Sequence, residues 1–147
     1  MRVVADLRYI DYQVNKAIKN VKRYQGDVSE VHDELATGIA TEVHHIFPKS
    51  QFPTIATYYE NLILLTSSQH RQKAHPKGNT QLVDKDYQLV CLMAKSQTIE
   101  TSLNEGDNFY RKESFVGVIN TGLDEHIEES ISFMDIRKFL VNKYLEF

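Results

Sequence analysis

The strongest constraint on the fold is that the two segments with β-strand character are both short. "IATEVHHIF" (39–47) is rich in β-branched and apolar residues and stops at Pro48, and "NLILLT" (61–66) is a nearly continuous apolar run. Two strands of this length cannot bury a large core by themselves, so neighbouring segments have to cover them. The sequence therefore predicts an α+β fold with a small central sheet embedded in helices.

Helical patterns stand on both sides of this unit. Apolar residues recur at mostly three- and four-residue steps over 6–24, which predicts an N-terminal helix. A Thr-x-x-Gln capping box at Thr66 predicts a second helix that begins at Ser67. Pro76 and Gly78 should end that helix within about three turns.

The C-terminal part, 84–147, is predicted to be a layer of helices with one strand. We expect a helix from Asp84 to about Leu103, a strand over 113–123 ("ESFVGVINTGL"), and a last helix capped by Ser132. The final helix is apolar up to the chain end, which leaves open that the chain is a piece of a longer enzyme.

The length of 147 residues suits one domain. We assign 1–147 to a single domain whose motif core lies at about 39–78. The lone Cys91 excludes an internal disulfide and paired-cysteine zinc knuckles. No apolar run reaches the roughly 18 residues of a membrane span, and charges interrupt the N-terminus too early for a signal peptide. We therefore expect a cytoplasmic protein without a membrane partner.

Basic residues outnumber acidic ones between His44 and Lys77, although the net charge of the chain is −3. The mildly acidic total argues against non-specific nucleic-acid binding by the whole surface. From His44 to Lys77 the chain nevertheless carries Lys49, Arg71, Lys73 and Lys77 against one acid, Glu60. A local basic face of this kind is suited to bind phosphates.

Three of the six histidines and one asparagine follow a definite order through the central unit. His44 and His45 stand side by side on the first strand, Asn61 begins the second, and His70 lies in the first turn of the next helix. Neutral imidazoles favour transition ions over magnesium. A metal ion held by His44 and His70 would tie the first strand to the helix and stabilise so small a unit.

The stretch "EVHHIFPKS…ENLILLTSSQHRQKAHP" resembles the HNH nucleases, whose ββα-metal motif runs His-His or Asp-His, then Asn, then His. The match covers about 44–76, under a quarter of the chain. The variant with two adjacent histidines is similar to colicin-type DNases and some restriction endonucleases. The resemblance implies a ββα-metal (His-Me finger) centre embedded in surrounding helices.

The same resemblance implies a role for each residue of the motif. His45 would be the general base, and Asn61 would hold it in place. His44 and His70 would bind one divalent ion, Mg²⁺, Mn²⁺, Ni²⁺ or Zn²⁺. The phosphates on either side of the cut would be bound by Lys49, Arg71, Lys73 and Lys77.

The match departs from the family at its last histidine. The family places this residue four positions after its partner, whereas here Ala74 takes that position and His75 follows. Five residues correspond to about 140° around a regular helix. Pro76 disfavours helical geometry at the preceding residue, which would let His75 turn back toward the metal. We expect His75 as a third ligand, with a phosphate contact as its alternative role.

Taken together, these features predict a metal-dependent endonuclease that hydrolyses DNA in a restriction, phage or defence context. The same residues do not separate DNA from RNA. A double-strand cutter with one site per chain would need two chains, so a homodimer stays open. The alternative from another class is a non-catalytic module that uses the histidines for structural zinc and binds nucleic acid or protein. Closed four-ligand coordination would favour the module, and an open position the enzyme.

Overall fold

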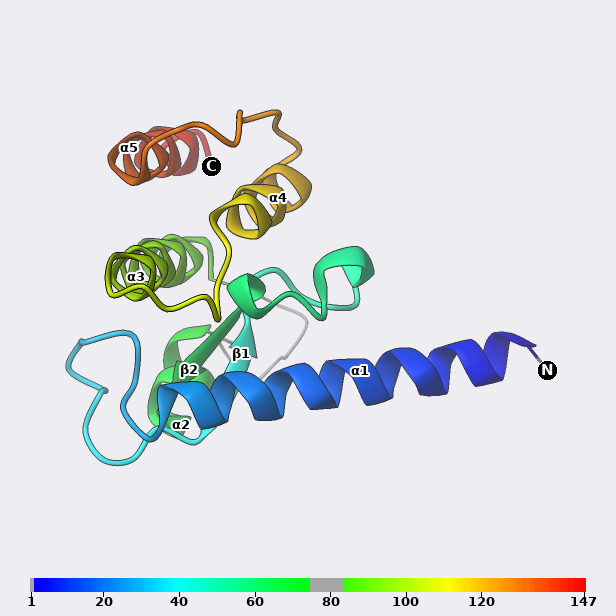
Figure 1. Ribbon diagram of the computed structural model, residues 1–147. Helices are drawn as coiled ribbons and strands as arrows, with labels where there is room; N and C mark the ends of the chain where they lie inside the picture. The colour runs from blue at the N-terminus through cyan, green and yellow to red at the C-terminus, as the bar shows by residue number, and fades with distance from the viewer. Residues whose placement is uncertain (1, 75–83) are drawn as a thin grey trace.

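The computed structural model describes residues 2–74 and 84–147 and has an α+β architecture (Figure 1). The helices are α1 (Arg2–Gln25), α2 (Ser67–Gln69), α3 (Lys85–Asn104), α4 (Lys112–Leu123) and α5 (Phe133–Tyr144). The strands are β1 (Glu42–His45) and β2 (Leu62–Leu65), and short turns are formed by η1 (Pro53–Ile55), η2 (Tyr59–Asn61) and η3 (His70–Ala74). The predicted α+β class is confirmed.

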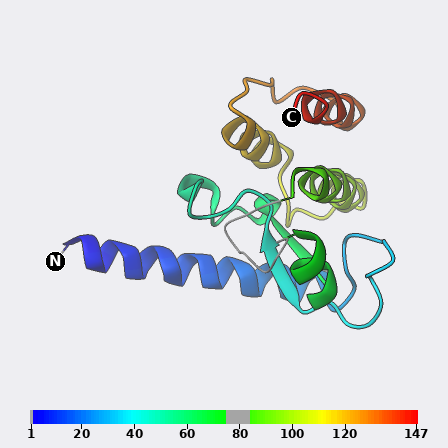
Figure 2. The same ribbon diagram turned by 180° about the vertical axis from the view of Figure 1, so that it is seen from behind.

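β1 and β2 form an antiparallel pair in which His44 lies opposite Ile63 and His45 opposite Leu62. Every residue of β2 is buried. The sheet lies between α1 and the stacked helices α3, α4 and α5, and the opposite views in Figures 1 and 2 agree on this order. Because helices cover β2 from both directions, its uninterrupted apolar run is accommodated without polar alternation.

The long helix α1 begins before the predicted residue 6 and ends at Gln25, where Gly26 takes a left-handed conformation with φ 80°. A residue without a Cβ adopts that conformation at little cost, so Gly26 ends the helix. Ala17 and Val21 pack against Leu62 of β2. The N-terminal half of α1 extends past the sheet (Figure 1).

Three helix starts agree with the positions predicted from the sequence. The Thr66 side chain accepts a hydrogen bond from the Gln69 amide, and the reciprocal bond completes the predicted capping box. Asp84 caps α3 and Ser132 caps α5 in the same way. None of the helices in the two described ranges is long and apolar enough to cross a membrane.

The predicted strand over 113–123 is wrong, because this segment is helix α4. Its apolar side chains, among them Phe115, Ile119 and Leu123, recur at four-residue steps and are buried. That helical period forms one continuous face against the core, which outweighs the β-branched composition that suggested a strand. The C-terminal layer therefore consists of helices alone in the described part.

The buried ion pair Glu30–Lys95 lies at the edge of β2 that does not pair with β1. The Glu30 amide donates to the Leu64 carbonyl at 3.0 Å, and a Glu30 carboxylate oxygen accepts from the Leu64 amide at 2.8 Å. Lys95 of α3 places its ammonium 3.0 Å from the other Glu30 oxygen and donates to the Tyr110 hydroxyl at 2.7 Å. Burial lowers the pKa of Lys95, and the Glu30 carboxylate opposes that effect. The pair thus fixes the segment after α1 to both β2 and α3.

The aromatic ring of Phe47, just after β1, packs directly over Gly122 of α4. A Cβ at position 122 would overlap that ring, whereas a Cβ at Gly117 on the same helix would meet open space. Phe47 is almost fully buried and has little room to move. Gly122 therefore sets how closely α4 approaches the loop after β1.

We predict that Gly122→Ala lowers the free energy of unfolding by about 1–3 kcal/mol, because the added methyl group overpacks against Phe47. The same substitution at Gly117 should raise it by about 0.5–1 kcal/mol, since alanine is the better helix former. Urea unfolding followed by circular dichroism measures both. Equal shifts for the two variants would contradict the packing described here, and Phe47→Leu should partly restore Gly122→Ala.

Candidate active site

The first part of the site is a pair of imidazole rings between β1 and η3. The ring centroids of His44 and His70 lie 5.3 Å apart with 60° between the ring planes. His44 is only 2% exposed, and the side chain of His70 is 24% exposed. Strand alternation places Glu42 on the same side of β1 as His44, and its carboxylate lies 3.9 Å from Nδ1 of His70.

This pair fits the donor set of a transition-metal site. Two imidazoles bound to one tetrahedral zinc ion have ring centroids about 5 Å apart, given metal–nitrogen bonds of about 2 Å. Among the side chains that the structure describes, those of residues 10–74 and 84–147, no group of three or more His, Cys, Asp or Glu is arranged to hold a metal. His75, the predicted third ligand, lies outside the described residues. Within the described residues the candidate site therefore contains two neighbouring imidazoles.

The helix that carries His70 is not the regular α-helix predicted from Ser67 onward. Only Ser67–Gln69 is α-helical, and His70–Ala74 forms a π-helical turn (η3) that lies against β1, seen in green in Figure 2. Hydrogen bonds in a π-helix span five residues and its turns are wider, and such turns are frequent at functional sites. The regular α-helical period used above to position His75 therefore does not apply to this turn.

His45 is held by a different part of the chain. Its Nε2 lies 2.9 Å from the carbonyl oxygen of Ala56, in the loop between the two strands. A carbonyl only accepts, so Nε2 carries the proton and donates it to this bond. In the neutral ring Nδ1 is then the acceptor. The contact sets both the orientation and the tautomer of His45.

The pKa of His45 is lowered from its ordinary value, mainly because burial disfavours the charged ring. The hydrogen bond to the Ala56 carbonyl opposes this shift, and the nearby positive charge of Lys49 adds to it. A lowered pKa keeps the ring neutral at physiological pH. Neutral His45 has a proton acceptor ready at Nδ1.

Asn61 braces the loop to which His45 is bonded. Its Oδ1 accepts from the Phe47 amide at 2.9 Å, while its Nδ2 donates to the carbonyls of Phe47 at 3.0 Å and Ile55 at 3.3 Å. Asn61 is completely buried, so each of these bonds replaces one to water. The side chain therefore joins the two ends of the loop and fixes the position of Ala56 next to Ile55.

Gln69 has the equivalent role for His70. Its Oε1 accepts from the Thr66 amide and from the Ser29 hydroxyl, and its Nε2 donates to the Val31 carbonyl and the Asp33 carboxylate. The amide is fully buried and all four of its hydrogen-bonding positions are used. The start of the helix before His70 is thereby tied to the segment 29–33.

The predicted phosphate-binding residues are placed differently from one another. Lys49 and Arg71 are exposed near β1 and η3. Lys73 instead pairs with Glu34 at 2.6 Å, and this contact raises the pKa of Lys73. Lys77 lies outside the described residues.

Sequence reasoning missed the partner of His45. Any residue supplies a carbonyl, so no side chain at position 56 signals the contact. The hydrogen bonds of Gln69 to segment 29–33 were also missed. The capping box predicted only the bond between Gln69 and Thr66. Comparison of the chain with protein-family models, curated proteins and solved structures gave no match, and the site is interpreted from its own geometry.

We predict that Asn61→Ala lowers the free energy of unfolding by about 2–4 kcal/mol, because it leaves buried backbone groups of Phe47 and Ile55 without partners. Asn61→Asp should also destabilise the fold, since a carboxylate accepts from the Phe47 amide but donates to neither carbonyl. Urea unfolding gives the values. Asn142→Ala, at an exposed position on α5, is the matched control and should leave the midpoint unchanged. A midpoint for Asn61→Ala equal to that of this control would contradict the bracing role.

Proposed function

We propose that the chain is a metal-dependent nuclease of the HNH type that hydrolyses DNA phosphodiester bonds. The observation that carries this proposal is the fixed orientation of His45, with Nε2 bonded to Ala56 and Nδ1 as the acceptor. A general base needs its accepting nitrogen oriented toward the proton that it takes, and its pKa must lie below the working pH. The loop braced by Asn61 and the lowered pKa of His45 meet these needs.

The proposed reaction starts with transfer of a proton from water to Nδ1 of His45. The water oxygen forms a bond to phosphorus while the bond from phosphorus to the 3′ oxygen breaks. The departing oxygen takes a proton from solvent, so the products carry a 5′ phosphate and a 3′ hydroxyl. His45 then releases its proton to water and returns to the neutral form.

His44 and His70 are proposed to hold one divalent ion, so that β1, β2 and the α2–η3 segment form a ββα-metal centre. When bound, the ion stabilises negative charge on the phosphoryl oxygens and on the departing 3′ oxygen. The carboxylate of Glu42 adds negative charge beside the two imidazoles, which favours a cation there. Exposed Lys49 and Arg71 are available for phosphates, whereas Lys73 would first have to leave Glu34.

Cleavage of supercoiled plasmid tests this function, with chelator, Mg²⁺, Mn²⁺, Ni²⁺ and Zn²⁺ in turn. The wild type should nick or linearise DNA with at least one ion and not with chelator. His45→Ala should lose at least about 100-fold in rate, the usual contribution of a general base, and retain bound metal. His32→Ala, at an exposed position, is the control and should cleave like the wild type.

Other outcomes of this assay point to other functions. Tight metal binding by the wild type without cleavage under any ion would contradict the nuclease and favour the structural-zinc module, which the burial of His44 also suits. Cleavage of RNA but not of DNA would change the substrate and keep the roles of the residues. The restriction, phage or defence context and the homodimer stay predictions.

The pH dependence of cleavage gives a separate prediction. Because the base acts in its neutral form, the cleavage rate should rise with pH and reach a plateau. The midpoint of the rise is an apparent pKa, which should lie below the ordinary histidine value of 6.5. Lys49→Ala should move this midpoint to higher pH, since it removes a positive charge that lowers the pKa of His45. Lys138→Ala, on α5, is the control. If Lys49→Ala leaves the midpoint unchanged, the rise of the rate with pH is not due to His45.

A further inference from the structure

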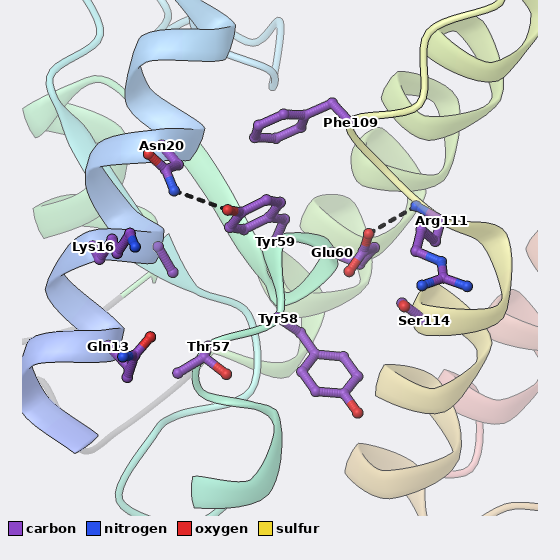
Figure 3. Close-up of a pocket in the computed structure, with 11 residues that line it drawn as sticks. Gln13, Lys16, Asn20, Thr57, Tyr58, Tyr59, Glu60, Phe109, Arg111 and Ser114 are labelled. Atoms are coloured by element: carbon purple, nitrogen blue, oxygen red, sulfur yellow. Dashed lines mark hydrogen bonds between the residues drawn. The ribbon is translucent and has the colours of Figure 1, made fainter. Parts of the chain in front are cut away.

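A groove runs between α1 and α4 beside the loop that holds His45 (Figure 3). Its volume is about 400 Å³. α1 lines one wall, the segment from Thr57 to Glu60 lines the floor, and the start of α4 lines the other wall. Thr57 follows Ala56, whose carbonyl anchors His45. The groove therefore adjoins the loop that anchors His45.

The wall formed by α1 offers a positive charge and an amide. Lys16 and Asn20 are four residues apart and so lie on one face of the helix. Lys16 is exposed, and no acidic side chain of residues 10–74 or 84–147 forms a salt bridge with it. Across the groove the Arg111 guanidinium is paired with Glu113 at 2.6 Å. Lys16 is thus the cation best placed for a phosphate.

The aromatic residues of the groove divide into a fixed wall and one exposed ring. Tyr59 stacks on Phe109 with ring centroids 4.6 Å apart, and Tyr24 stacks on Phe109 at 4.1 Å. The Tyr59 hydroxyl accepts a hydrogen bond from Asn20 at 2.8 Å. Tyr58 takes no part in this stack and is 39% exposed at the groove. Tyr58 and Lys16 both line this groove, Lys16 on the α1 side and the Tyr58 ring toward α4 (Figure 3). An exposed aromatic ring and a cation in one groove are the combination with which proteins bind unpaired nucleotides.

The buried carboxyl group of Glu60 closes the floor. One of its oxygens accepts from the Arg111 amide at 2.9 Å, and Glu60 is only 4% exposed. Burial raises the pKa of Glu60, and the hydrogen bond from the Arg111 amide opposes that shift. The carboxyl group is thus tied to the residue that precedes α4.

We propose that this groove binds an unpaired nucleotide of the DNA strand to be cut, with its base on Tyr58 and its phosphate at Lys16. The inference rests on the proposed nuclease function and names its substrate class. A base within a duplex is stacked on its neighbours and has no free face for Tyr58. The preferred substrate is therefore single-stranded DNA, or DNA with an unpaired segment at the cut.

Binding of fluorescently labelled oligonucleotides to the full chain tests the groove, with chelator present so that no cleavage occurs. Tyr58→Ala should weaken binding of a single-stranded 20-mer about tenfold and leave binding of the matching duplex nearly unchanged. Tyr58→Phe, which keeps the ring, should bind like the wild type. Phe147→Ala, at an exposed aromatic residue after α5 that does not line the groove, is the control and should have no effect.

The salt dependence of the same binding tests the phosphate contact. Lys16→Ala should make the slope of log affinity against log salt shallower by about 0.7, the value for one phosphate on a single strand. Lys22→Ala is the control, because six residues turn a helix by about one and two-thirds turns and place Lys22 on another face. Unfolding midpoints equal to that of the wild type would show that the variants are folded.

The two proposals fail in different ways. Wild-type affinity of Tyr58→Ala and Lys16→Ala for the single strand would overturn the groove, while loss of plasmid cleavage in His45→Ala would still support the nuclease. Equal losses for single strand and duplex would also overturn the groove as a site for an unpaired base. Weaker single-strand binding by both groove variants, together with no cleavage under any ion, would support the groove and overturn the nuclease.

Discussion

The fold depends on buried amide side chains that hydrogen-bond to the backbone of its loops. Two strands of four residues each pair few backbone groups, so the long connections need other partners. Asn61 and Gln69 supply them for the loop between the strands and for the segment before β1. Gln88 of α3 donates to the Ile46 carbonyl, and Asn120 of α4 exchanges two bonds with Ile127. A side-chain amide both donates and accepts hydrogen bonds. It therefore supplies the backbone of a loop with the partners that a neighbouring strand would otherwise provide.

The candidate active site is assembled from these braced segments. His44 lies on β1, but His45 takes its orientation from a loop carbonyl, and His70 begins a π turn tied down through Gln69. Chemistry that depends on the direction of a ring nitrogen needs its support fixed within a fraction of an ångström. Here polar contacts of buried side chains provide that support, and Phe47 over Gly122 adds a packing contact from α4.

The elements that could be predicted are those whose signal is local. Thr66, Asp84 and Ser132 each satisfy an amide three residues further on, so the starts of α2, α3 and α5 were visible in the sequence. The strand predicted over 113–123 was wrong because its β-branched composition suggests a strand, whereas its buried apolar residues follow a helical period. The π turn after Gln69 has no known local signature, and the regular helix expected there was wrong for that reason.

The sequence by itself determined the α+β class, the order of the histidines and asparagine, and the strand that carries His44 and His45. Only the tertiary structure decided which groups meet: the ring of His44 with that of His70, His45 with the Ala56 carbonyl, and α1 with α4 around a groove. Helix caps and hydrophobic periods are interactions between residues a few positions apart, so they appear in the chain as patterns. A bond to a distant backbone carbonyl places no demand on the side chain at that position, and so it leaves no pattern to read.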